Sequence, residues 1–67
     1  MEDRERNSIT VRRDGGVWAA QFHGPHAEEV RRAFGTDTIP TPWTTETPRE
    51  TVRDELAARN PGVKVGW

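Results

Sequence analysis

Residues 8–23 read Ser-Ile-Thr-Val-Arg-Arg-Asp-Gly-Gly-Val-Trp-Ala-Ala-Gln-Phe-His, and this stretch decides the fold. Apolar and polar side chains alternate on both sides of the Asp-Gly-Gly triplet, which is typical of two strands joined by a tight turn. The turn can fall on Asp14-Gly15 or on Gly15-Gly16, and both registers leave the same side chains on one face. We therefore expect a β-hairpin over residues 8–13 and 17–23. Its buried face is expected to carry Ile9, Val11, Trp18, Ala20 and Phe22, and its other face Thr10, Arg12, Val17, Ala19 and Gln21.

The same segment, from Ile9-Thr10-Val11 through Asp14-Gly15-Gly16 to Phe22, resembles the first hairpin of HicB-type antitoxins. The resemblance covers residues 9–22. The rest of the chain departs from that pattern, because its second predicted helix and its stretch rich in threonine and proline have no counterpart there. The resemblance implies a hairpin and assigns no functional residue.

Two helices are expected after the hairpin. Gly24-Pro25 ends the second strand and opens a helix, since proline suits the first helical position, and Gly35 suits the position past the helix end. The sequence Thr-Pro-Arg-Glu at residues 47–50 has the pattern of a capping box. It predicts a second helix that runs to about Arg59.

The segment between these helices, residues 36–47, contains two prolines and six threonines. This composition disfavours both a helix and a central strand, so we expect an extended loop with Ile39 and Trp43 pinned to the core. Beyond the second helix, Asn60-Pro61-Gly62 is a turn sequence, and alternation over residues 63–67 predicts a last strand.

These elements predict one α+β domain over residues 8–67 with the order β-β-α-α-β. We expect a three-stranded antiparallel sheet, in the strand order 2-1-3, packed on two helices, and a disordered tail over residues 1–7. The other sheet face is left uncovered. The expected core comprises Ile9, Val11, Trp18, Ala20, Phe22, Val30, Phe34, Ile39, Val52, Leu56, Val63 and Val65.

Composition narrows the classes of function. The chain has 67 residues, a net charge of −1 and no cysteine, so it offers neither disulfides nor thiolate metal ligands. No secretory signal or apolar run long enough for a membrane span is present, and we expect a cytoplasmic protein with no membrane partner. Nine of its ten basic residues are arginine, a bias that favours a bacterial source.

The sequence favours no catalytic chemistry. Ser8 is the single serine and has no patterned histidine or aspartate partner, and no glycine-rich phosphate loop is present. We therefore expect a protein that is not an enzyme and has no cofactor. His23 and His26 form a weak alternative site for a metal or a small ligand, with Glu29 as the nearest carboxylate.

Nucleic-acid binding is the first alternative to the leading hypothesis and ranks ahead of the histidine site. Arginines on the two predicted helices and the hairpin could form a basic stripe, although acidic residues are interleaved with them. The candidate residues are Arg12, Arg31, Arg32, Arg49 and Arg53.

The leading hypothesis is a small protein-interaction module or accessory subunit that binds a protein partner or itself. Long loops in small domains are often functional, and an open sheet face accepts another layer. The predicted partner-binding residues lie in the loop or on the open face of the hairpin: Thr36, Asp37, Thr38, Thr41, Trp43, Arg12, Val17, Ala19 and Gln21.

Overall fold

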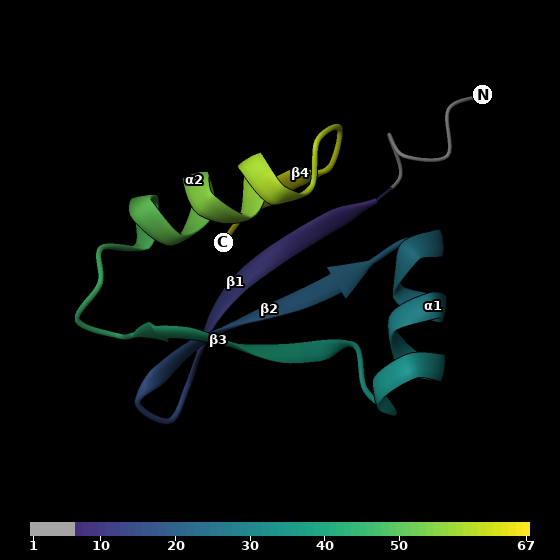
Figure 1. Ribbon diagram of the computed structural model, residues 1–67, viewed down its shortest axis with the longest axis horizontal. Coiled ribbons are helices and arrows are strands. Elements are labelled where there is room, and N and C mark those ends of the chain that lie inside the picture. Colours follow the sequence, from purple (N-terminus) through teal and green to yellow (C-terminus); the bar gives the residue numbers. More distant parts are fainter. Residues whose placement is uncertain (1–6) are drawn as a thin grey trace.

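The computed structural model describes residues 7–67, and Figure 1 shows how their elements are arranged. The order is β1 (Ser8–Asp14), β2 (Val17–His23), α1 (Pro25–Phe34), β3 (Thr38–Thr44), α2 (Arg49–Arg59) and β4 (Lys64–Gly66). The α+β class is confirmed. The tail predicted over residues 1–7 lies outside the described residues except for Asn7. No helix within residues 7–67 has the length and apolar character needed to cross a membrane.

The hairpin adopts the register in which Gly15-Gly16 is the turn, so that Ile9 lies opposite Phe22. Gly15 has a φ of 67°, a left-handed conformation that glycine reaches without a steric penalty. Of the two registers that the sequence left open, the hairpin adopts the one that turns at Gly15-Gly16. The predicted division of the hairpin into two faces holds in either case.

The four strands form one mixed sheet in the order β3-β2-β1-β4. The predicted three-stranded antiparallel sheet is therefore wrong in its number of strands and in one strand direction. The last strand, β4, does lie beside β1 as expected, but it runs parallel to β1, with Val65 opposite Ile9. Helix α2 forms the crossover that a parallel pair requires.

Strand β3 occupies residues 38–44, where we expected a loop. The Phe22 N–H donates to the Asp37 carbonyl at 2.8 Å. Asp37 is therefore one of the positions whose backbone groups bond to β2. In an antiparallel ladder the alternate positions, Pro40 among them, turn their backbone groups toward the open edge. A missing N–H there costs no sheet hydrogen bond, so proline is compatible with this outer strand.

Helix α1 begins and ends as predicted. Gly35 follows it in a left-handed conformation with a φ of 79°, and its N–H donates to the Arg31 carbonyl at 2.7 Å. At the other end Gly24 has no side chain to cap the helix. Asn7 supplies the missing acceptor, because its Oδ1 accepts the His26 N–H at 2.9 Å.

Helix α2 ends at Arg59 as predicted, but the capping box predicted at residues 47–50 is wrong. Pro48 occupies the N-cap, and no side chain within the described chain caps the helix. The Thr47 carbonyl instead accepts the Nε1 hydrogen of Trp18 at 2.9 Å. Thr47 thus lies before the start of the helix, and its carbonyl is bonded to the Trp18 side chain.

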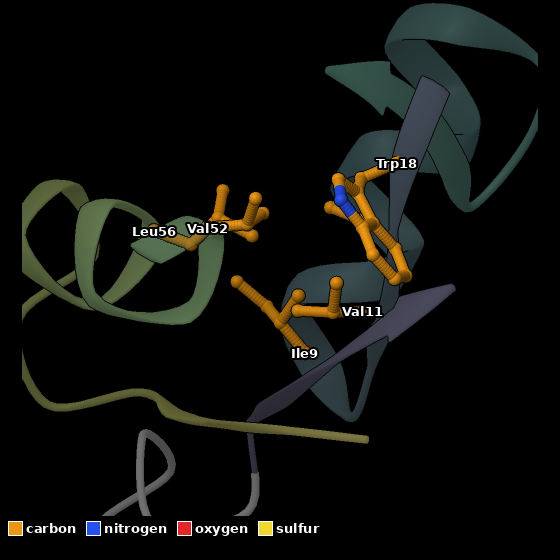
Figure 2. Packing of buried hydrophobic residues seen from close by; sticks show 6 residues of the cluster. Ile9, Val11, Trp18, Val52 and Leu56 are labelled. Atoms are coloured by element: carbon orange, nitrogen blue, oxygen red, sulfur yellow. The ribbon is translucent and has the colours of Figure 1, made fainter. Parts of the chain in front are cut away.

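The core lies between α2 and one face of the sheet (Figure 2). Val52 and Leu56 of α2 point toward Ile9, Val11 and Trp18, and burial of these side chains is the main stabilising contribution to a domain of this size. Four side chains that were expected in or against the core pack around this cluster and are partly buried: Phe22, Trp43, Val63 and Val65.

Two predictions of burial are wrong. Phe34 was expected in the core, but it is 67% exposed, because it ends α1 beyond the turns that carry the buried Ala27 and Val30. Ala19 was expected on an accessible face, but it is fully buried. It lies between Arg12 and Pro40 on the neighbouring strands, whose larger side chains flank its methyl group.

Candidate functional site

A groove of about 430 Å³ lies between α1 and α2, over the part of the sheet formed by β2 and β3. Figure 1 shows why it exists: α2 runs along one side of the sheet, and α1 stands at the far end of the hairpin. The core face of β2 and β3 is therefore only partly covered. We take this groove as the candidate functional site.

The floor of the groove is apolar, and β2 and β3 supply it. Ala20 and Phe22 come from β2, and Ile39 and Trp43 come from β3. Along β3 the odd positions are partly buried, whereas the two prolines between them are exposed. The period-2 alternation of a strand thus aims Ile39 and Trp43 into the groove.

Thr41 is the polar residue of the floor, and its hydroxyl is engaged by the backbone. The pairing of β2 with β3 shifts register between Val17 and Ala19. At this irregularity the Thr41 Oγ1 donates to the Trp18 carbonyl at 2.7 Å and also accepts the Trp43 N–H at 3.3 Å. The hydroxyl therefore completes the sheet, and it leaves the groove floor apolar in character.

Helix α1 forms one wall of the groove. The ring of His26 meets the ring of Phe22 edge-on, with centroids 5.3 Å apart, and fixes the start of the helix against the sheet. Val30 and Ala33 continue the wall, and the exposed ring of Phe34 stands at its end. An exposed aromatic ring beside an apolar hollow is typical of a contact surface.

Helix α2 forms the opposite wall with Leu56, Arg59 and Asn60. The Arg59 guanidinium lies over the ring of Trp43, 5.5 Å from its centroid. The Asn60 Nδ2 donates to the Leu56 carbonyl at 2.8 Å. This wall therefore combines an apolar base with a polar rim, which suits an amphipathic ligand.

The predicted partner-binding residues fall in three places. Thr41 and Trp43 lie in the groove. Thr36 and Asp37 join α1 to β3, and Thr38 is the first residue of β3. The Asp37 carboxylate pairs with Arg31 at 3.2 Å. The remaining residues, Arg12, Val17, Ala19 and Gln21, belong to the opposite face of the sheet, where the Arg12 guanidinium donates to the Gln21 carbonyl oxygen at 2.8 Å.

The two histidines point to different sides of the sheet. His23 Nε2 lies 2.9 Å from the Thr10 hydroxyl on the face away from the groove, whereas His26 lines the groove. His26 Nδ1 is 3.7 Å from the Glu29 carboxylate. Between residues 7 and 67 the structure gathers no three histidine, aspartate or glutamate side chains in a way that could hold a metal.

The arginines of the nucleic-acid alternative are divided between three elements. Arg31 is paired with Glu28 at 2.9 Å and with Asp37, and Arg32 is exposed on the same helix. Arg12 lies on the open sheet face. Arg49 and Arg53 of α2 do come together, because both guanidinium groups lie over the ring of Trp67, at 5.1 and 5.2 Å.

Arg13 of β1 extends this pair into a ladder. Its guanidinium and that of Arg49 both lie over the ring of Trp18, at 5.4 and 5.3 Å. A shallow hollow of about 370 Å³ opens here, with Glu46 and Glu50 among its lining residues. No sequence signal places Trp67 beside α2, since this contact depends on how β4 returns to the sheet.

The groove as a whole was not predicted, although the sequence contains part of the pattern that forms its floor. Ile39, Thr41 and Trp43 alternate with Pro40 and Pro42, which is the period-2 pattern of a strand. The exposure of Phe34 had no such signal, because the helix pattern alone placed it on the apolar stripe with Ala27 and Val30.

Comparison with known proteins adds no further assignment: no protein-family description, no curated protein and no solved structure matches this chain.

Proposed function

We propose that this protein is a small non-catalytic interaction module that binds the apolar face of an amphipathic helix in the groove between α1 and α2. The observation that carries the proposal is the groove itself, an apolar floor left open on the core face of a sheet. Phe34, 67% exposed at its border, enlarges the apolar surface that a partner would cover.

The dimensions of sheets and helices favour a helix as the ligand. Neighbouring strands lie about 4.8 Å apart and a helix is about 10 Å wide, so one helix covers about two strands. Four strands therefore provide room for two helices side by side. Helix α2 packs on β1 and β4, whereas α1 contacts the sheet at β2 and leaves an apolar hollow over β2 and β3.

The chemistry of the groove supports the same ligand. Its floor is lined by aliphatic and aromatic side chains, and Thr41, its polar member, bonds to the backbone. Its rims carry Glu29 and Arg59, which leave the solvent-facing side of a bound helix in a polar setting. Apolar anchors at helical spacing with polar flanks are the features that helix-binding grooves recognise.

The test is selection of binders from a displayed library of amphipathic helical peptides, followed by calorimetric titration of the best peptide. Ala33 lines the groove and Ala58 is an exposed α2 alanine outside it, so they form a matched pair. Ala33→Glu should weaken binding by about 30-fold or more, because it places a charge against the buried ligand face. Ala58→Glu should change the affinity by less than about twofold.

Two outcomes would contradict the proposal. One is a library that yields no binder to the folded protein. The other is a binder that Ala33→Glu does not weaken but Arg12→Ala or Gln21→Ala does, which would place the contact on the opposite sheet face.

Nucleic-acid binding is kept as a second candidate because of the ladder formed by Arg13, Arg49 and Arg53 with two indole rings. Guanidinium groups and an indole side by side suit a single strand, which offers phosphates and stacking bases. Anisotropy of a labelled oligonucleotide should rise at low salt and fall with added salt. Arg49→Gln should reduce the affinity, and a flat titration up to about 50 µM protein would exclude this candidate.

A further inference from the structure

Opposite charges stand on the two sides of the groove. Among the described residues that line it, Glu29 of α1 supplies the carboxylate and Arg59 of α2 supplies the guanidinium. Their side chains are 76% and 66% exposed, so both charged groups lie at the rims rather than on the apolar floor. A ligand that fills the groove therefore meets a negative charge on one side and a positive charge on the other.

Both rim charges make only long contacts within the described chain. Glu29 lies 3.7 Å from the Nδ1 of His26, and Arg59 lies 3.8 Å from the carboxylate of Glu55. The ion pairs elsewhere among the described residues measure 2.9 to 3.2 Å. The Arg59 guanidinium is also held over the ring of Trp43, which belongs to the groove floor. The cation is thus kept at the edge of the apolar hollow, where it can form a closer pair with a carboxylate of the ligand.

A helix that lies in the groove has two flanks, one on each side of its apolar stripe. One flank faces the α1 rim and the other faces the α2 rim, and turning the helix end for end exchanges them. A helix with acidic residues on one flank and basic residues on the other therefore forms both charge pairs in one direction only. If both flanks carry the same charge, one rim attracts the helix and the other repels it in either direction.

We propose that the groove selects a helix whose apolar stripe is bordered by acidic residues on one flank and basic residues on the other. The acidic flank lies along Arg59, and the basic flank lies along Glu29. This inference rests on the proposed function, since it names the charge pattern of the helix that the same groove binds. Apolar burial supplies most of the affinity, and the two rim residues determine which helix binds and in which direction.

The test compares four peptides that share the apolar stripe of the binder selected from the library. Two have uniform flanks, of glutamate or of lysine, and two carry glutamate on one flank and lysine on the other, in both arrangements. In calorimetric titration at about 50 mM salt, one mixed peptide should bind about fivefold tighter than either uniform peptide. The difference should shrink at about 500 mM salt, because exposed charges are then screened.

Reversal of one rim charge should change which peptide binds best. Glu29→Arg makes both rims positive, so the glutamate peptide should become the tightest of the four. Arg59→Glu makes both rims negative and should favour the lysine peptide. The four peptides are ranked within each variant, so a general loss of affinity, such as the loss of the Trp43 contact in Arg59→Glu, leaves the comparison intact.

Glu28→Arg is the matched control. It makes the same change in net charge on the same helix as Glu29→Arg, but Glu28 does not line the groove. The mixed peptide should therefore remain the tightest ligand of this variant. Circular dichroism of each variant shows that it is folded.

Two results would overturn this inference. The first is equal binding of all four peptides to the wild-type protein. The second is a ranking of the peptides that Glu29→Arg changes no more than Glu28→Arg does. Either result would leave the helix-binding groove standing, whereas failure of all four peptides to bind would refute the proposed function as well.

Discussion

Trp18 joins three parts of the molecule through one side chain and its backbone. Its ring is 2% exposed and packs in the core, its Nε1 donates to the Thr47 carbonyl ahead of α2, and its carbonyl accepts the Thr41 hydroxyl of β3. Alternation in the hairpin sequence was enough to predict that this ring is buried. The two hydrogen bonds were not predictable, because they depend on segments more than twenty positions away along the chain.

Replacement of Thr41 tests the bond that bridges the irregular pairing of β2 and β3. Thr41→Val keeps the size of the side chain but removes the donor to the Trp18 carbonyl. The free energy of unfolding should fall by about 1 to 2 kcal/mol, because a partly buried carbonyl loses its partner. Thr41→Ser keeps the hydroxyl and should cost less. Urea denaturation followed by tryptophan fluorescence measures both, and equal losses for valine and serine would contradict the role given to this bond.

At the scale of elements, the helices and the hairpin were predictable, and β3 was not. The helix limits followed from Pro25, Gly35 and the turn at residues 60–62, which are local signals. Strand β3 was missed because Pro40 and Pro42 count against a strand unless it lies at the edge of a sheet. Whether a strand is central or outer is a property of the whole sheet, and the segment does not contain that information.

Gly35 at the C-terminal end of α1 and Gly16 in the hairpin turn form a matched pair of glycines. Gly35 has a φ of 79°, whereas Gly16 does not adopt a left-handed φ, and a methyl group at either position meets no atom within 4 Å. Gly35→Ala should therefore lower the free energy of unfolding by about 1 kcal/mol through backbone strain alone. Gly16→Ala should change it by less than about 0.5 kcal/mol. Thermal unfolding of the two variants measures the difference, and a Gly16→Ala loss as large as that of Gly35→Ala would contradict this explanation.

At the scale of the whole molecule, the candidate site illustrates what local patterns omit. Thr41 and Trp43 were predicted as contact residues and do line the groove, but they were assigned to a loop rather than to a strand. Phe34 was assigned to the core. The groove arises from the positions of α1 and α2 over one sheet, and those positions depend on packing between distant segments. Sequence patterns therefore predicted the faces of the elements and left open how the elements cover one another.

Pro40 at the outer margin of β3 has a consequence for the molecule at high concentration. If two copies met along this margin, the Pro40 nitrogen would have no hydrogen to donate at a position where an added strand needs a donor. The row of backbone hydrogen bonds between two such copies is therefore interrupted at β3. Copies of the chain that approach one another from this side are left with side-chain contacts, which dissociate readily, and the native fold is protected from conversion into fibrils along this margin.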